Sequence, residues 1–287
     1  MDYLEFYKLQ EYPFSNAVDS RFYFNSEQHS EAIIRVKYAI DTRKGLAVVV
    51  GDIGTGKTTL ARRLLDELDE EKYEAALLVV LHSSVTSDWL MKKIAVQIDV
   101  ENPGDSKIEL LGQIYERLLD IHESGLKTAV LIDEVQMLQS REIMEEFRGI
   151  LNMETDGGKL ITFVFFGLPE MESLIALDAP LKQRVAVMCR MTAFEEQVTD
   201  EYIRHRLKIA GCDKDLFTPD AIKDIHFYSK GIPRLINTIC DNSLLEGSLV
   251  KKQEIDKDII ESIAVTLGLK EVKEADEKKA AKRRSGM

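Results

Sequence analysis

Five short apolar runs in the first two thirds of the chain predict the strands of a buried parallel sheet. Between these runs, apolar residues recur at every third or fourth position, which is the pattern of amphipathic helices. A strand that is buried on both faces is apolar throughout. The alternation of the two patterns therefore predicts an α/β fold, with helices covering both faces of a five-stranded parallel sheet. The predicted strands are residues 46–50, 75–81, 128–132, 160–166 and 185–191.

From Val198 onward the strand pattern stops and only helical periodicity remains. The helical patterns of this part cover about residues 198–210, 219–229, 233–247 and 255–267. We therefore predict that residues 26–195 form the α/β core and that residues 196–268 form a separate small α-helical domain. Residues 269–287 are highly charged and almost devoid of large apolar side chains, which predicts a disordered tail.

Composition narrows the class of protein. The chain has 287 residues, of which 45% are hydrophobic and 31% charged, so it is long enough for one large core and a smaller module. Its net charge of −12 opposes nucleic-acid binding over the molecule as a whole. The three cysteines are widely spaced, and no apolar run reaches the ~18 residues of a membrane helix. Together with an N-terminus unlike a signal peptide, these features predict a cytoplasmic protein without membrane insertion.

The clearest chemical motif follows the first predicted strand. Residues 51–58 match G-x-x-x-x-G-K-[ST], the pattern of a phosphate-binding loop between a strand and a helix. The glycines let successive backbone N–H groups surround a phosphate chain, while Lys57 supplies a positive charge and Thr58 a hydroxyl for Mg²⁺. The following helix directs the positive end of its dipole at the same anion. The residues predicted to bind nucleotide are Gly51, Asp52, Ile53, Gly54, Thr55, Gly56, Lys57, Thr58 and Thr59.

Two acidic residues end the third predicted strand. Asp133 and Glu134 follow an apolar run, and ligands of parallel sheets lie beyond the carboxyl ends of the strands. We expect Asp133 to hold Mg²⁺ together with Thr58, and Glu134 to polarise the attacking water. An acid pair that only caps a helix would look the same in isolation, but the phosphate-binding loop upstream favours the metal and base roles.

Three further residues have two interpretations each. His82 follows the second predicted strand and either hydrogen-bonds Glu134 or is an ordinary exposed histidine. Arg184 is either an arginine offered to the γ-phosphate of a neighbouring subunit or a surface residue. Arg234 follows a proline at a helix start and either folds back onto the phosphates or is solvated. Residues 1–25 are rich in aromatic side chains, which predicts an N-terminal strap, a segment that packs on the surface of a domain. Its aromatic side chains either cover the nucleotide base or anchor the segment in a core.

These motifs resemble those of AAA+ ATPases of the ExeA (general secretion pathway A) type, over about residues 9–265. The stretches that carry the resemblance occur in order: YPF, RFYFNSEQHSEAI, GDIGTGKTTLARRLL, VLIDEVQML, LNMETDGGKL, FGLPE, LKQRV, YIRHRLKIAG, LFTPDAI and GIPRLINTICDNSLL. The resemblance implies an αβα core with a helical lid that binds ATP and Mg²⁺ and hydrolyses ATP to ADP and phosphate. It also implies that Arg184 is an arginine finger acting in trans and Arg234 a sensor-2 arginine. His82 then stands where the family often has a polar residue that restrains the catalytic glutamate.

Two departures from the family pattern are visible. The family commonly has glutamine after the glycine that closes the fourth strand, where this chain has Leu168. A polar contact that helps to position water is therefore expected to be weaker or to come from elsewhere. Secretion members of the family commonly continue into a membrane helix and a peptidoglycan-binding region, and neither pattern occurs here, so a direct cell-wall role is not expected.

Three functions remain open from the sequence. The first is an ATPase that switches its own ring or filament assembly and serves proteins of a secretion or type IV pilus system. The second is a transposition helper that forms filaments on duplex DNA, which the net charge opposes and a basic tail favours. The third is a nucleotide-gated switch with negligible turnover, which Leu168 keeps open. The basic tail residues are Lys278, Lys279, Lys282, Arg283 and Arg284.

Overall fold

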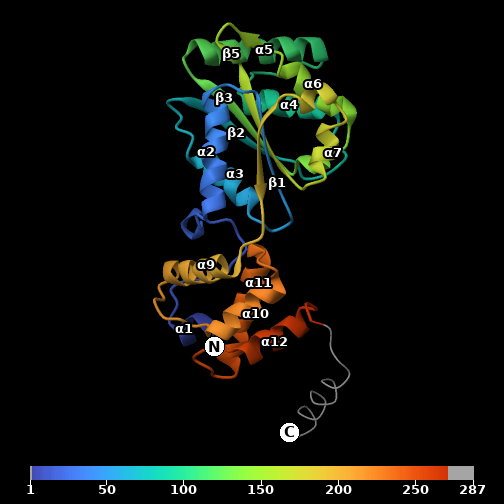
Figure 1. Ribbon diagram of the computed structural model, residues 1–287. Coiled ribbons are helices and arrows are strands. Elements are labelled where there is room, and N and C mark those ends of the chain that lie inside the picture. The colour runs from blue at the N-terminus through green and yellow to red at the C-terminus, as the bar shows by residue number, and fades with distance from the viewer. Residues whose placement is uncertain (1, 271–287) are drawn as a thin grey trace. The chain divides into compact units, whose positions relative to one another are not determined.

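The computed structural model describes residues 2–270 and divides them into two compact units (Figure 1). One unit is residues 25–192, and the other combines residues 2–24 with residues 193–270. Apart from its first two residues, the predicted tail at 269–287 lies outside the described part of the chain. The N-terminal segment is therefore grouped with the C-terminal helices, far away in sequence.

The first unit is an α/β fold built on a five-stranded sheet. The strands pair in the order β2-β3-β6-β1-β7, and all four pairings are parallel. All five predicted strands are present, and β7 has the predicted bounds. The elements in chain order are α2 (Glu27–Asp41), β1 (Leu46–Gly51), α3 (Lys57–Asp66), β2 (Tyr73–Val79), α4 (Ser87–Gln97), α5 (Lys107–Glu123), β3 (Lys127–Asp133), η2 (Val135–Met137), α6 (Arg141–Ile150), β4 (Glu154–Thr155), β5 (Gly158–Lys159), β6 (Ile161–Gly167), α7 (Met171–Ile175), α8 (Ala179–Lys182) and β7 (Val185–Met191).

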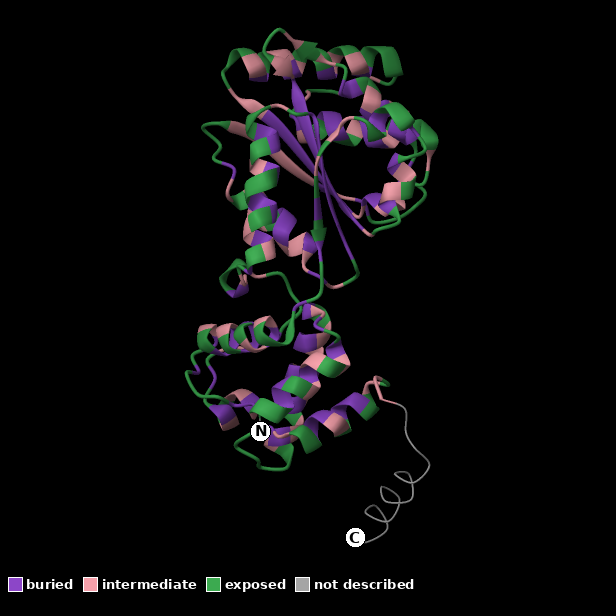
Figure 2. Cartoon of the chain, viewed as in Figure 1, coloured by how far each residue is buried: buried purple, intermediate pink, exposed green. Residues whose placement is uncertain are grey.

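Helices cover both faces of this sheet, as the continuous apolar strands require. In β1, Leu46, Val48 and Val50 belong to a large core cluster with α4, α5 and α6. The intervening Ala47 and Val49 are equally buried, on the face where α2 and α3 lie (Figures 1 and 2). Successive strand residues point to opposite faces, so full burial of β1 places helices on both sides.

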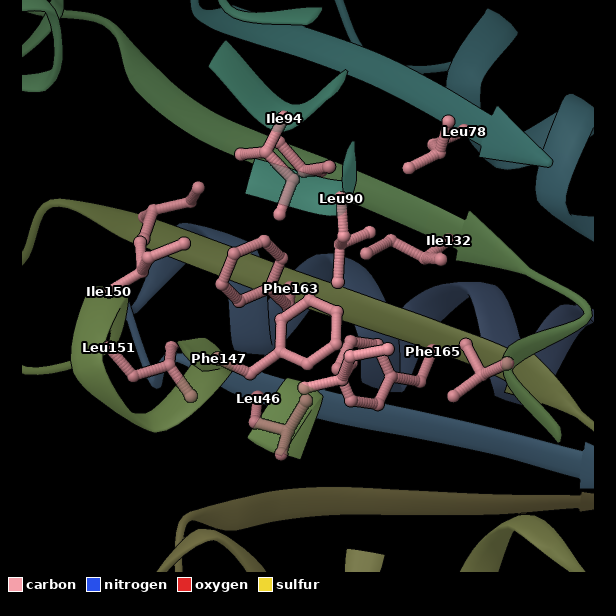
Figure 3. Close-up of a cluster of buried hydrophobic side chains, with 14 of the residues drawn as sticks. Leu46, Leu78, Leu90, Ile94, Ile132, Phe147, Ile150, Leu151, Phe163 and Phe165 are labelled. Carbon is pink, nitrogen blue, oxygen red and sulfur yellow. The ribbon is translucent and has the colours of Figure 1, made fainter. Parts of the chain in front are cut away.

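Aromatic side chains fill the centre of the larger core cluster. The ring of Phe147 on α6 lies 5.1 Å from the ring of Phe163 and 4.7 Å from that of Phe165, both on β6 (Figure 3). Both pairs are edge-to-face, the favoured arrangement of aromatic rings. These contacts fix α6 on the sheet, and α6 follows directly on the segment that leaves the carboxyl end of β3.

The strand register brings the chemical motifs to one edge of the sheet. Gly51 pairs with Met191, Val50 with Gly167, and Val79 with Asp133, all at the carboxyl ends of their strands. The phosphate-binding loop and the acidic pair therefore leave the sheet at the same edge, as expected for a ligand site of a parallel sheet.

Two local features differ from the prediction. Strand β2 ends at Val79 rather than at residue 81, and Leu81 is 83% exposed. The apolar run continued into the loop, so periodicity alone placed the strand end two residues too late. The tight turn at Asp156 and Gly157 joins two very short strands, β4 and β5, which form a separate antiparallel hairpin.

The second unit is a helical bundle with its own core. Four long helices lie close to their predicted bounds, and buried residues of the N-terminal segment, among them Tyr7 and Phe14, belong to the same core cluster. Core anchoring, one of the two interpretations of the aromatic strap, thus describes these side chains. The elements are α1 (Tyr3–Tyr7), η1 (Ser20–Phe22), α9 (Glu196–Ile209), α10 (Pro219–Ser229), α11 (Pro233–Leu249) and α12 (Lys257–Thr266).

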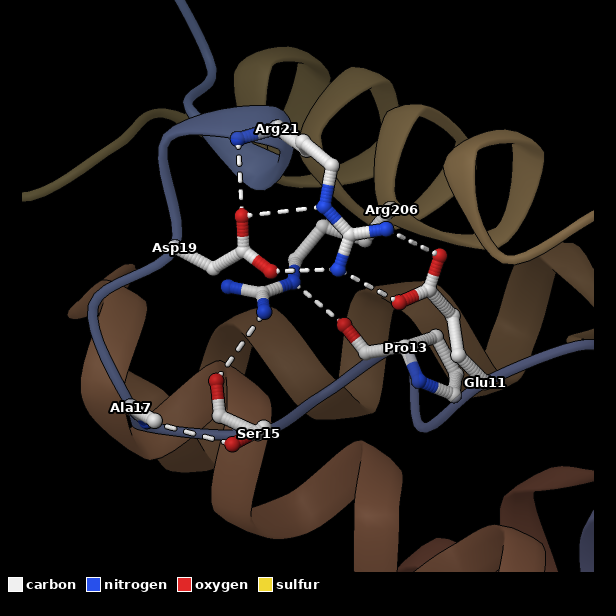
Figure 4. A network of polar contacts seen from close by, with 7 residues as sticks. All are labelled: Glu11, Pro13, Ser15, Ala17, Asp19, Arg21 and Arg206. Atoms are coloured by element: carbon white, nitrogen blue, oxygen red, sulfur yellow. Dashed lines mark hydrogen bonds and ion pairs between the residues drawn. The ribbon is translucent and has the colours of Figure 1, made fainter.

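A buried arginine on α9 holds the N-terminal segment in this bundle (Figure 4). Arg206 donates from Nε to the carbonyl oxygen of Pro13 and from Nη2 to that of Ser15, at 2.9 Å for Ser15. Its guanidinium carbon also lies 4.9 Å from the centre of the Phe22 ring, within cation–π range. The planar guanidinium group of Arg206 thus donates hydrogen bonds to backbone carbonyls and stacks on an aromatic ring at the same time.

Candidate nucleotide-binding site

The loop after β1 has a backbone that glycine alone fits well. A β-carbon at Gly51 would lie 2.7 Å from the carbonyl oxygen of Met191 and 2.8 Å from the hydroxyl of Thr55. Gly54 and Gly56 have φ angles of +81° and +97°, in the left-handed region that other residues rarely adopt. Side chains at these glycine positions would therefore fill the concave surface of the loop. The open backbone fits the binding of a phosphate chain by backbone N–H groups.

Lys57 begins α3 and is buried in the loop. Its ammonium group donates hydrogen bonds to the carbonyl oxygens of Gly51, at 2.7 Å, and Asp52, at 2.9 Å. Burial lowers the pKa of Lys57, and the nearby carboxylates of Glu134 and Asp133 act in the opposite direction. A buried ammonium group that has only neutral carbonyl oxygens as hydrogen-bond acceptors gains strongly when an anion enters the loop.

A hydrogen bond connects Thr58, in the first turn of α3, with Asp133, the last residue of β3. The hydroxyl of Thr58 donates to Oδ2 of Asp133 at 2.6 Å, and the backbone N–H of Glu134 donates to Oδ1 at 2.9 Å. Burial raises the pKa of Asp133, and these two hydrogen bonds counteract the rise because they favour the carboxylate. A hydroxyl and a carboxylate in contact are the kind of oxygen ligands that Mg²⁺ takes in nucleotide sites, so the predicted metal pair fits the cation.

Glu134 leaves β3 with a left-handed backbone, at φ 61° and ψ 37°. Its side chain is partly buried and accepts a hydrogen bond from the amide of Gln136, which is part of the short helix η2. A hydrogen bond between His82 and Glu134, one of the two interpretations of this histidine, is not formed among the described residues. Because β2 ends at Val79, His82 lies in an exposed loop, with its ring centre 6.2 Å from that of Trp89.

Arg184 lies at the opposite edge of the sheet from the phosphate-binding loop. It directly precedes β7, whose first residue pairs with Leu46 at the start of β1 and whose last pairs with Gly51. The seven residues of β7 span about 20 Å between these two ends. Arg184 donates to the side-chain oxygen of Asn152 at 2.5 Å, and its Nη1 has no hydrogen-bond partner among the described residues. It is therefore far from the loop of its own chain.

Arg234 belongs to the helical unit and is exposed in the first turn of α11. The preceding Gly231 has a φ of +71°, and a β-carbon there would collide with the carbonyl oxygen of Phe194. The backbone N–H of Phe194 in turn donates to the carbonyl oxygen of Gly231 at 2.8 Å. The glycine and the proline of this motif thus fix where α11 begins, and with it the position of Arg234 on that helix.

Comparison with known proteins identifies part of the chain directly. Residues 40–175 match the family model described as an AAA domain. This segment contains the phosphate-binding loop, the acidic pair and Leu168, and its fold has just been described. By this match, residues 40–175 are similar to an AAA domain. Arg184 and Arg234 lie outside the matched segment.

The predicted resemblance to the general secretion pathway A type is confirmed by a curated relative. The chain is 35% identical over 246 residues to General secretion pathway protein A of Aeromonas hydrophila, which covers 85% of this chain and 44% of that protein. The chain thus spans less than half the length of this relative.

Solved structures of similar fold cover most of this chain. Cdc6p from Pyrobaculum aerophilum matches with a TM-score of 0.64 and 19% identity, over 85% of this chain and 67% of its own. A chain of Drosophila ORC bound to DNA matches with a TM-score of 0.65 and 15% identity, over 92% and 65%. At this identity the likeness shows a shared fold alone.

The candidate site has two contacts that sequence reasoning missed, one made by His29 and the other by Gln136. The side chain of His29 on α2 is buried, its Nδ1 lies 2.6 Å from the Ser26 hydroxyl, and burial lowers its pKa to about 4. A β-carbon at Gly56 would lie 3.1 Å from Nε2 of His29, so this neutral ring backs the phosphate-binding loop. The second contact is made by Gln136. Both residues occur in the stretches that carry the family resemblance, but no spacing rule indicated their contacts.

Proposed function

We propose that this protein is a Mg²⁺-dependent ATPase whose nucleotide state controls its assembly with further copies of itself. The observation that carries the proposal is the meeting of Lys57, Thr58 and Asp133 at one sheet edge, with Glu134 directly after them. This combination of a buried ammonium group, a hydroxyl and two carboxylates is what phosphoryl transfer to water requires.

Each residue has a distinct proposed role. Lys57 and the backbone N–H groups of the loop bind the phosphates, while Thr58 and Asp133 hold Mg²⁺. When bound, Mg²⁺ would neutralise phosphate charge. Glu134 orients the attacking water and accepts its proton. Arg234 is proposed to sense the nucleotide from the helical unit.

Arg184 is proposed to act on the nucleotide of a neighbouring copy. Its distance of about 20 Å from the loop of its own chain, the length of β7, supports a role in trans. A guanidinium group stabilises the charge of a phosphoryl transition state and is worth about 10³-fold or more in turnover when supplied by a partner. Turnover per chain should therefore rise with protein concentration.

Mixing two inactive variants tests this arrangement. Arg184→Ala and Glu134→Gln proteins are each expected to hydrolyse ATP at least 100-fold more slowly than wild type, with nearly unchanged ATP binding. In a mixture, an intact Glu134 on one chain meets an intact Arg184 on its neighbour, so a measurable part of the activity should return. Lys182→Ala, at an exposed cation two residues away, is the matched control and should retain wild-type turnover. Absence of recovery at any mixing ratio would rule out action of Arg184 in trans.

For the cellular role, we propose service to a secretion or type IV pilus system through protein partners. The support is the curated relative, whose name refers to general secretion. No helix among residues 2–270 is both long and apolar enough to cross a membrane. A cytoplasmic location, with attachment to the membrane only through partners, is part of the proposal. The basic residues that favoured DNA binding, Lys278 to Arg284, lie outside the described residues.

A further inference from the structure

The amide of Gln136 connects Glu134 to the end of strand β6. Its Nε2 donates to Oε2 of Glu134, and its Oε1 accepts from the backbone N–H of Leu168 at 3.0 Å. A backbone N–H can only donate, so this contact fixes which end of the amide carries the oxygen and directs the –NH₂ end at Glu134. The side chain therefore bridges two strands at the edge where the nucleotide residues meet.

The last residue of β6 leaves room for this bridge. A β-carbon at Gly167 would lie 2.7 Å from Oε1 of Gln136 and 3.0 Å from the sulfur of Met171. Alanine at this position would push the amide away from the Leu168 N–H. The absence of a side chain at Gly167 therefore allows Gln136 to accept the hydrogen bond from the Leu168 N–H. This contact does not depend on the one with Glu134.

We propose that Gln136 is the positioning residue for Glu134 and supplies the polar group that the apolar side chain of Leu168 does not offer at the end of β6. This inference rests on the proposed ATPase activity. With Oε2 of Glu134 held by the amide, Oε1 remains free to accept a hydrogen bond from the attacking water. The amide acts on the carboxylate and not on the nucleotide, so it contributes to turnover and not to ATP affinity.

Two substitutions separate the two ends of the amide. Gln136→Met keeps the length of the side chain and removes both hydrogen bonds. Gln136→Glu keeps an acceptor for the Leu168 N–H but replaces the donor by a charge that repels Glu134. Both variants are expected to lower kcat by about 10- to 100-fold, with KM for ATP within about threefold of wild type. Gln139→Met changes an exposed glutamine of the same segment and is expected to match wild type.

The outcomes distinguish this inference from the proposed function. If wild type hydrolyses ATP and Gln136→Glu retains its kcat, the positioning role is wrong. An increase of kcat in Gln136→Met would mean that the amide holds Glu134 away from water, which also overturns it. If wild type shows no turnover, the proposed function fails. Crystal structures of wild type and Gln136→Met then test whether Gln136 positions the carboxylate of Glu134. Gln136→Met should then show a displaced Glu134 carboxylate, and an unchanged position would contradict the inference.

Discussion

Lys57→Ala is expected to lower the affinity for ATP by at least about 100-fold, because it removes the positive charge nearest the phosphate chain. In the structure this ammonium group is already buried and donates to the carbonyls of Gly51 and Asp52. The two carbonyls are on the loop itself, so the group is oriented toward the anion site before nucleotide binds. Equilibrium titration with a fluorescent ATP analogue and Mg²⁺ measures the loss.

The control for this variant is Lys72→Ala. The side chain of Lys72 is 70% exposed and forms an ion pair with Asp69 in the surface turn before β2, so its removal should leave ATP affinity unchanged. A melting curve of Lys57→Ala without nucleotide checks that the fold is intact. Retention of micromolar ATP binding in a folded Lys57→Ala protein would contradict the assignment of this loop to nucleotide.

Arg206→Ala is expected to destabilise the helical unit by about 3–5 kcal/mol. The substitution leaves the carbonyl oxygens of Pro13 and Ser15 without their donor (Figure 4). It also removes the cation over the ring of Phe22. Arg206 also donates to the hydroxyl of Tyr202, which donates in turn to Asn237 on α11. The helix that carries Arg234 is therefore connected to the N-terminal segment through this arginine.

The position of the single tryptophan allows the effect to be assigned to one unit. Trp89 packs on the core of the α/β unit, so its fluorescence reports on that unit, whereas far-UV circular dichroism reports on all helices. In urea, the dichroism transition of Arg206→Ala should move to lower concentration while the fluorescence transition stays close to wild type. Arg204→Ala, at a half-exposed arginine on the same helix, should change stability by less than about 1 kcal/mol. Equal effects of the two substitutions would contradict the role given to Arg206.

The sheet of this protein could be predicted almost completely from its sequence. Strands such as β1 and β6 are buried on both faces, so each is an almost continuous apolar run, and the two strands end at Gly51 and Gly167. The family motifs occur at fixed positions after these runs. The end of β2 could not be predicted, because Leu81 continues the apolar run although it is exposed in a loop. The hairpin of β4 and β5 has only two residues in each strand, too few to show a period.

The contacts that hold the candidate site depend on residues far apart in sequence. Gln136 was part of a recognised motif, but its bridge to Leu168 exists only because β3 and β6 are neighbours in the sheet. His82 was considered as a partner of Glu134 because it follows β2, the strand that pairs with β3. The position of its ring depends on where β2 ends, and this strand end was predicted two residues too late. Likewise, no local pattern indicated that the carbonyls of Pro13 and Ser15 meet Arg206, since about 190 residues separate them.

The most direct test of the central claim is the rate of ATP hydrolysis by wild type and by Glu134→Gln, measured with Mg²⁺ over a range of protein concentrations. The proposed function predicts that wild type hydrolyses ATP, and that the variant binds ATP with similar affinity while its turnover falls at least about 100-fold. Equal rates in the two proteins, with nucleotide bound to both, would contradict an ATPase and leave a nucleotide-gated switch.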